Sequence, residues 1–325
     1  MAGATAPCGR LLGAHMPTAG GISNAVTRGH EIGCTALQVF TASPRQWTHK
    51  PLEPEAVEAW RQACRSTGMG FTVAHDSYLI NLAAPDPVIL EKSVDAFQAE
   101  LHRAAALEIP WVVTHMGAHM GIGEEAGLDI LCESLRRILR ATDGLPVGIA
   151  LETTAGQGTG LGHTFEQIAR VVEGCAGHPR IGVCLDTCHI FVAGCDIRDQ
   201  EAYESTLARF SRVIGLERLK VIHANDAKKP LGSRVDRHAH IGEGEIGTEA
   251  FRRLVNDPRL AGIPIIIETP DAETMHAVNL RRLRELCSHG DAGPGEGPPY
   301  TEPLNPAAPR IQDGGGTARS KSGRP

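Results

Sequence analysis

The sequence contains no long run of apolar residues. No hydrophobic stretch approaches the ~18–20 residues that a helix needs to cross a bilayer, so we expect no membrane-spanning helix. Residues 1–8 also lack the charged and apolar regions of a secretory signal. Together these absences favour a cytoplasmic protein.

The cysteines show no pairing motif. There are nine, and they are scattered without a C-x-x-C spacing, which is typical of reduced thiols in an intracellular protein. Cys184 and Cys188 flank Asp186 in the segment CLDTC, and we expect both to pack in the core. A metal site built on thiolates is therefore disfavoured.

An excess of positive charge is absent as well. Lysine and arginine number 32 against 38 aspartates and glutamates, which gives a formal charge of −6. Taken alone, this balance argues weakly against nucleic-acid binding. The argument loses force where carboxylates bind metal ions, because bound cations dominate the local field.

The length and composition fit one large domain. The chain has 325 residues, of which 42% are hydrophobic, enough for a sizeable core. Residues 289–325 are rich in glycine and proline and carry no apolar periodicity, so we expect a disordered tail. The folded domain is predicted to span residues 1–288.

Short apolar runs alternate strictly with amphipathic segments along this domain. Such an alternation indicates parallel βαβ units, and eight of them close into a (β/α)₈ TIM barrel. The expected strands begin near Leu11, Ala36, Phe71, Trp111, Val147, Ile181, Leu219 and Ile263. The expected helices cover 20–33, 54–67, 87–107, 124–141, 163–173, 201–214 and 248–255, with a last one ending near 288 and a loop over 224–247.

Most of these apolar runs end in a side chain that can bind a metal ion. In a barrel the C-terminal ends of all strands meet on one face, where barrel enzymes carry their chemistry. One such residue means little, but six in consecutive strands predict a polynuclear metal site. The six are His75, His115, Glu152, Asp186, His223 and Glu268.

Three further candidates lie close to these strand ends in the sequence. His189 follows Asp186 by three residues, and Asp236 and His238 form an Asp-x-His pair in the long loop. The resulting set of imidazole and carboxylate ligands suits Zn²⁺ best, with Mn²⁺ or Fe²⁺ as substitutes. Nine ligands suffice for three ions when one carboxylate bridges.

Several metal ions at one site fit the hydrolysis of a phosphodiester. They lower the pKa of bound water and stabilise charge on the attacking and leaving oxygens. Glu152 is central in strand order, so we expect it to bridge two ions and to accept the proton of the nucleophile. His15 and His119 are weaker candidates for a role beside the metal ligands, and His240 and His276 are expected to be ordinary loop and helix residues.

Five segments contain the residues that carry a family resemblance. They are HDSYLINL at 75–82, ETTAGQG at 152–158, CLDTCH at 184–189, HANDAK at 223–228, and GSRVDRH at 232–238 followed by GEG at 242–244. These segments resemble the endonuclease IV family of zinc-dependent apurinic/apyrimidinic endonucleases. The matches are long and literal, and together with the alternating strands and helices they cover roughly residues 10–287.

The resemblance implies a TIM barrel that holds three zinc ions. It also implies double-stranded DNA with abasic or 3′-blocked sites as the partner, and cleavage 5′ to the abasic site that leaves a 3′-hydroxyl and a 5′-deoxyribose phosphate. The residues that would enter the DNA match Arg45, in FTASPRQW, and Tyr78 with Leu79. We expect a monomer. The implied zinc ligands are His75, His115 and Glu152 for one ion, Glu152, Asp186, His223 and Glu268 for the second, and His189, Asp236 and His238 for the third.

The sequence departs from the family pattern at two positions. Met116 stands where the family commonly has proline, and Thr153 where it often has asparagine. Neither change removes a ligand, so we expect them to affect rate more than reaction type.

Two alternatives remain at this point. A metal-dependent sugar-phosphate isomerase or epimerase on the same barrel would use similar strand-end ligands, but has no role for His189, Asp236 and His238. A non-catalytic module that binds damaged DNA would be expected to lose the bridging carboxylate, and Glu152 is present.

Overall fold

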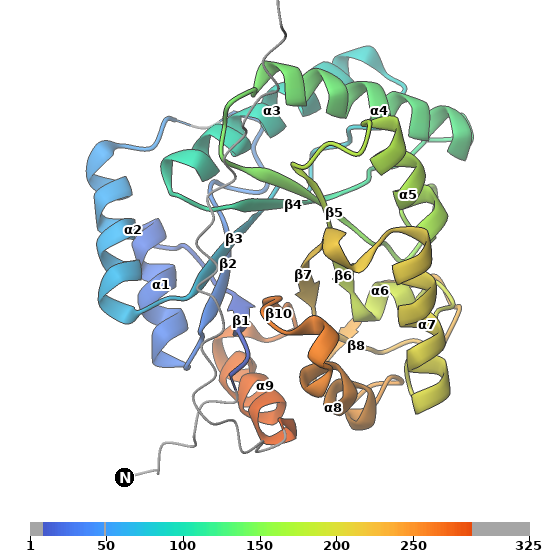
Figure 1. Cartoon of the computed structure of the whole chain (residues 1–325). Helices are drawn as coiled ribbons and strands as arrows, with labels where there is room; N and C mark the ends of the chain where they lie inside the picture. Colours follow the sequence, from blue (N-terminus) through green and yellow to red (C-terminus); the bar gives the residue numbers. More distant parts are fainter. Residues whose placement is uncertain (1–8, 49, 288–325) are drawn as a thin grey trace, which may run out of the picture.

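The computed structural model describes residues 9–48 and 50–287, and its parallel strands form a closed barrel surrounded by helices (Figure 1). The strands follow the order β1-β10-β7-β6-β5-β4-β3-β2, which confirms the predicted TIM barrel. They are β1 (Leu12–His15), β2 (Ala36–Phe40), β3 (Phe71–His75), β4 (Trp111–His115), β5 (Gly148–Glu152), β6 (Ile181–Asp186), β7 (Leu219–His223) and β10 (Ile265–Ile267).

The helices begin and end where local signals place them. Pro54 opens α2 and Gly68, in the left-handed conformation with φ 66°, ends it. Asp86 caps α3 by accepting hydrogen bonds from the amides of Val88 and Ile89. The helices are α1 (Ile22–Glu31), α2 (Pro54–Thr67), α3 (Pro87–Ala106), α4 (Glu124–Ala141), α5 (Phe165–Gly174), α6 (Thr187–Val192), α7 (Gln200–Val213), α8 (Thr248–Asn256) and α9 (Ala272–Leu286), with short 3₁₀ turns η1 (Leu216–Arg218) and η2 (Pro258–Leu260).

The barrel interior is filled by a small apolar layer beneath the strand ends. Val113, Ala150 and Val221 belong to this buried cluster. Side chains two residues apart on a strand share a face. The residues that follow these positions by two are therefore also directed inward, and they are His115, Glu152 and His223.

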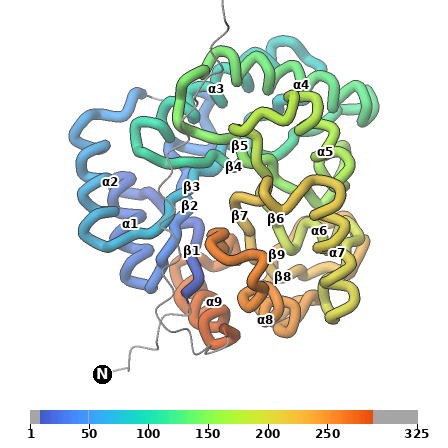
Figure 2. Tube along the Cα trace, in the orientation of Figure 1, coloured from blue at the N-terminus to red at the C-terminus, as the bar shows by residue number. Residues whose placement is uncertain are grey.

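Two elements were missed where the sequence predicted a plain connection. The short helix α6 starts immediately after β6, because the Asp186 carboxylate accepts a hydrogen bond from the His189 amide at 2.8 Å. The expected loop over 224–247 contains an antiparallel hairpin of β8 (Asp226–Ala227) and β9 (His238–Ala239), which Figure 2 shows beside α8. Both elements are too short to produce a hydrophobic period.

None of the helices described is long and apolar enough to span a membrane. The predicted tail of 289–325 lies outside the described residues, as do residues 1–8.

Candidate metal centre

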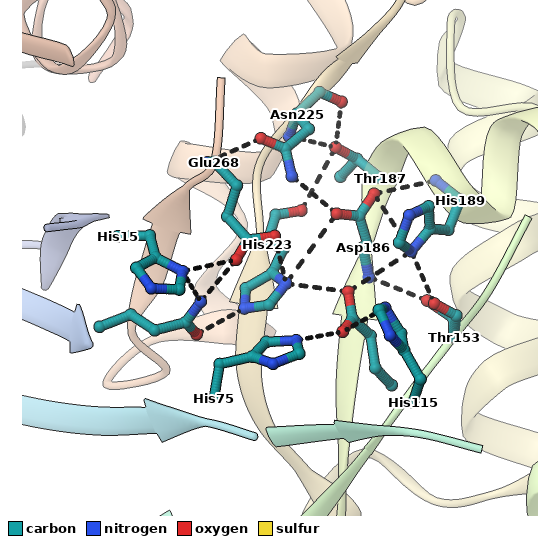
Figure 3. Close-up of polar contacts among 12 residues, drawn as sticks. His15, His75, His115, Thr153, Asp186, Thr187, His189, His223, Asn225 and Glu268 are labelled. Atoms are coloured by element: carbon teal, nitrogen blue, oxygen red, sulfur yellow. Dashed lines mark hydrogen bonds and ion pairs between the residues drawn. The ribbon is translucent and has the colours of Figure 1, made fainter. Parts of the chain in front are cut away.

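The strand-end residues converge at the C-terminal mouth of the barrel, as Figure 3 shows. His75, Glu152, Asp186 and His223 are between 0 and 4% exposed. Buried charges of this kind require partners or metal ions, because desolvating them alone is costly. The site is therefore a buried polar cluster above the apolar layer.

Two histidines are held so that one ring nitrogen faces Glu152. His75 Nδ1 donates to the carbonyl of Asp76 at 3.0 Å, and its Nε2 lies 3.1 Å from Glu152 Oε2. His223 Nε2 donates to Gln38 Oε1 at 2.8 Å, and its Nδ1 lies 3.0 Å from Glu152 Oε1. Metal-binding histidines are typically oriented in this way by a hydrogen bond from the other nitrogen.

The same arrangement recurs around Asp236. His189 Nδ1 donates to the carbonyl of Thr153 at 2.8 Å, and its Nε2 lies 3.3 Å from Asp236 Oδ2. His238 Nδ1 donates to the carbonyl of Glu268 at 3.2 Å, and its Nε2 lies 3.3 Å from Asp236 Oδ1. His238 Nε2 also lies 3.8 Å from Asp186 Oδ2, so this nitrogen faces two carboxylates.

The ligand atoms form three groups that share Glu152 or adjoin it. Within each group the nearest side-chain atoms lie within 4.8 Å of one another, a spacing that a metal ion can bridge. The groups are His75, His115 and Glu152; Glu152, Asp186, His223 and Glu268; and His189, Asp236 and His238. The chemistry and number of donors fit Zn²⁺, and the grouping matches the three sets that the family resemblance implied.

Glu152 is ionised by its surroundings. Burial by itself would raise the pKa of this carboxyl, but the nearby imidazoles of His223, His115 and His189 outweigh it and hold the pKa well below its usual value. Its two oxygens face different histidines: Oε2 lies 3.2 Å from His115 and Oε1 3.0 Å from His223. This geometry suits a bridging carboxylate.

Two amide side chains complete the cluster, and the sequence analysis did not find them. Gln38 Nε2 donates to Glu268 Oε1 at 2.5 Å from the middle of β2. Asn225 Nδ2 donates to Asp186 Oδ2 at 2.6 Å, and its Oδ1 accepts from the Glu268 amide at 2.8 Å. The available signal was a polar residue inside the apolar run ALQVF for Gln38, and the HAND segment for Asn225.

Two buried thiols lie near the site. Sγ atoms of Cys184 and Cys188 lie close enough to neighbouring ligands to form metal-capable groups. Burial raises the pKa of both thiols, and the adjacent carboxylates raise it further. Both cysteines are fully buried, in agreement with the packing role expected for them.

The weaker histidine candidates divide into two kinds. His15 Nδ1 lies 3.1 Å from Glu268 Oε1, so it supports a ligand. His119 Nδ1 accepts hydrogen bonds from the amides of Gly121 and Gly123, so it organises its own loop. His276 was expected to be ordinary, but it is 2% exposed and lines the cavity above the metal centre.

Asp226 fixes the hairpin that carries two of the candidate ligands, Asp236 and His238. Its carboxylate accepts hydrogen bonds from the amides of Gly242, Gly244 and Ile246, each at 3.0 Å. Gly244 is required there, because a Cβ atom would lie 2.4 Å from the carbonyl of Ala227. The GEG segment therefore wraps around Asp226 and holds β8 and β9 in place.

The three residues expected to enter DNA lie on the loops that follow β2 and β3, at the mouth of the barrel. Tyr78 is 65% exposed, and its ring contacts that of Phe40 edge-on with centroids 5.3 Å apart. Arg45 is exposed and Leu79 is half-buried. Tyr78 borders a cavity of about 320 Å³ that reaches down to His75 and His189.

Comparisons with known proteins agree with this geometry. A family model described as a xylose isomerase-like TIM barrel matches residues 26–286. "Probable endonuclease 4" of Chloroflexus aurantiacus is 54% identical over 276 residues, which cover 84% of this chain and 97% of that protein. The protein of the same name from Geobacter sulfurreducens is 49% identical over 278 residues, 85% of this chain and 94% of that protein.

Comparison with solved structures distinguishes relatives in sequence from proteins that share only the fold. Endonuclease IV from Thermus thermophilus aligns with a TM-score of 0.76 at 37% identity, over 85% of this chain and 98% of that one. A D-tagatose 3-epimerase-like protein aligns with a TM-score of 0.64 at only 18% identity, over 85% and 96% of the two chains, which shows a common fold alone. The sequence identities to its relatives, extending along the whole barrel, show that the chain belongs to the endonuclease IV family.

Proposed function

We propose that the protein is a zinc-dependent endonuclease that hydrolyses the phosphodiester 5′ to abasic sites in double-stranded DNA. The products are a 3′-hydroxyl and a 5′-deoxyribose phosphate. The observation that carries the proposal is the set of three ligand groups gathered around Glu152 at the barrel mouth. The similarity to proteins named endonuclease 4 supports DNA as the substrate.

The proposed cofactor is three zinc ions, with Mn²⁺ as a substitute. Each of the three groups would hold one ion, with Glu152 shared between the first two. Bound ions of this kind lower the pKa of water and stabilise charge on the attacking and leaving oxygens. The chain's own contribution is to fix the ligand orientation through Gln38, Thr153 and Asn225.

Glu152 is assigned the bridging role. Its low pKa keeps it negatively charged between two groups of ligands at any physiological pH. Proton acceptance by Glu152 stays a prediction for mutagenesis.

The exposed residues at the mouth would recognise the damage. An abasic nucleotide has no base to unstack, so extruding it from the duplex costs less than extruding an intact one. Tyr78 and Leu79 would then occupy the vacated space, and Arg45 would enter the duplex from the neighbouring loop. The partner is therefore duplex DNA with abasic or 3′-blocked sites, bound by one monomer.

A sugar-phosphate isomerase is the second candidate, since epimerases share this fold. It gives no function to His189, Asp236 and His238, whose ligand atoms form a group of their own. Elemental analysis of the purified protein separates the two candidates. A content near three metal ions per chain supports the endonuclease, whereas one or two ions support the isomerase.

The direct test uses duplex DNA with a single abasic analogue, incubated with the full-length protein with and without chelator. We expect a nick on the 5′ side that the chelator abolishes. Trapping of a covalent protein–DNA adduct by borohydride, or a 3′-unsaturated aldehyde product, would contradict hydrolysis.

A further inference from the structure

A buried polar cluster on α3 lies outside the metal centre and contacts the loop that carries Arg45. We infer that Glu100 and Arg103, here called the α3 clamp, are positioning residues that hold this loop and act on DNA binding through Arg45. The inference rests on the proposed function for its substrate. It assigns no contact between the α3 clamp and either DNA or metal.

The α3 clamp fixes the start of the loop at Thr41, directly after β2. The Thr41 hydroxyl donates to Glu100 Oε2 at 2.5 Å and accepts from Arg103 Nε at 2.9 Å. Arg103 also donates to the carbonyl oxygen of Thr41. Thr41 and Glu100 are each 4% exposed, so the hydrogen bond between them is shielded from water, whereas those of Arg103 are partly buried.

The same arginine reaches the far end of the loop. Arg103 Nη1 donates to the carbonyl of Lys50 at 2.9 Å. Thr41 and Lys50 therefore bracket the segment that carries Arg45, and one planar guanidinium holds both ends. No helix or strand is assigned within described residues 41–48, so the conformation of Arg45 depends on such side-chain contacts.

A third contact ties the middle of the loop to the Tyr78 loop. Ser77 Oγ donates to the carbonyl of Pro44 at 2.9 Å. Pro44 directly precedes Arg45, and Ser77 directly precedes Tyr78. Arg45 and Tyr78, two of the three residues proposed to enter DNA, are thus held in fixed relation, with the α3 clamp holding the loop of Arg45.

Burial raises the pKa of Glu100, while the Thr41 hydrogen bond and the Arg103 charge oppose that shift. A variant that removes the arginine charge would therefore disturb the buried carboxyl as well as the loop. Arg103→Lys avoids this difficulty. It keeps a positive charge near Glu100, but a single ammonium cannot reproduce the forked contacts to Thr41 and Lys50.

The test compares Arg103→Lys, Arg45→Ala and the double variant in the full-length, metal-loaded protein. We measure kcat and KM on a duplex with one abasic analogue, and turnover of the small diester bis(p-nitrophenyl) phosphate. We expect Arg103→Lys to raise KM for the duplex by about 5- to 30-fold, the effect of losing about one charge-assisted contact. Turnover of the small diester should stay within about 2-fold, because the metal centre is untouched.

The double variant decides whether Arg103 acts through Arg45. If it does, adding Arg103→Lys to Arg45→Ala should raise KM no further, since coupled residues are not additive. Fully additive effects, or a parallel loss of small-diester turnover, would overturn the inference. Arg137→Lys is the matched control, because Arg137 on α4 pairs with Glu91 of α3 but does not contact the loop, and it should leave KM unchanged.

Hydrogen exchange separates this inference from the proposed function. Arg103→Lys should speed amide exchange in 42–48 relative to the wild type, whatever the substrate is. Unchanged exchange there would refute the α3 clamp even if abasic DNA is cleaved. Faster exchange in a protein that cleaves no abasic DNA would instead refute the proposed function.

Discussion

The residue that joins two ligand groups of the centre is Glu152, and it offers the most direct test of the chemistry. Glu152→Gln keeps the shape but removes the charge shared by these groups. We expect turnover on abasic DNA to fall ~10²–10⁴-fold while DNA binding survives. Turnover within ~10-fold of wild type would show that Glu152 does not have the bridging and proton-accepting roles. Glu58→Gln, at an exposed position on α2, serves as the control.

Tyr78 is the exposed aromatic residue that is proposed to enter DNA. Its ring is 65% exposed and borders the cavity that reaches His75, so it is accessible to a bound duplex. We expect Tyr78→Ala to weaken binding to abasic duplex by ~1–3 kcal/mol, the contribution of one aromatic–base stack. Binding to undamaged duplex should change little, because phosphate contacts dominate it. Equal losses on both duplexes, measured by fluorescence anisotropy, would show that Tyr78 only packs on the rim.

The sequence located the metal-capable residues but not the amides that orient them. A histidine or glutamate at the end of a strand is visible because strand ends share one face. Gln38 lies in the middle of β2, and only the closed barrel brings it to His223 and Glu268. Such contacts join residues that lie far apart in the chain, and no local sequence pattern predicts them.

Among the secondary-structure elements, the β8–β9 hairpin depends for its position on a single residue, Asp226. Asp226→Asn keeps one acceptor oxygen but loses the charge that receives the amides of Gly242, Gly244 and Ile246. We expect a loss of ~1–3 kcal/mol in the free energy of unfolding, as for other hydrogen bonds to buried charged groups. Metal content should fall selectively, because Asp236 and His238 lie on or beside this hairpin.

Thermal denaturation and elemental analysis check this prediction together. A variant that is destabilised but retains its full metal content would show that the hairpin holds its ligands without Asp226.

The elements that were missed share one property. Both α6 and the β8–β9 hairpin are defined by single side-chain contacts, from Asp186 and Asp226 respectively, and not by an apolar repeat. The longer helices α2 and α4 were predicted with their observed bounds, because both are long amphipathic segments, and Pro54 and Gly68 mark the ends of α2. Elements with a long apolar repeat could therefore be predicted from the sequence, and short elements without such a repeat could not.

For the molecule as a whole, metal binding should depend on pH. Burial alone would lower the pKa of His238, but Asp236 and Asp186 raise it to about 9. Burial also opposes ionisation of Asp236 and His189, yet their mutual pairing lowers the pKa of Asp236 and raises that of His189 well above its usual value. In the metal-free protein these histidines hold protons near neutral pH, and a metal ion must displace them.

Metal affinity should therefore fall as pH is lowered from about 9 towards 6. Competition with a chelator at several pH values measures this, and proton release on zinc addition provides a second readout. The stability of the metal-free protein should depend on pH in the opposite direction to its metal affinity. The ion pairs of the histidines stabilise the fold fully below about pH 6.5, and this contribution to the free energy of unfolding is lost as pH rises through about 9. A metal affinity that does not change with pH would contradict the assigned protonation.

The candidate metal centre is buried and the rim around it is exposed, so salt should affect DNA binding and cleavage differently. Glu152, Asp186 and His223 are fully buried, and charges in such positions are screened little by dissolved salt. Arg45 is exposed on a loop, where phosphate contacts weaken steeply as salt displaces them. Added salt should therefore raise KM for DNA while leaving kcat nearly constant, so that one titration with potassium chloride separates capture of the duplex from cleavage of its backbone.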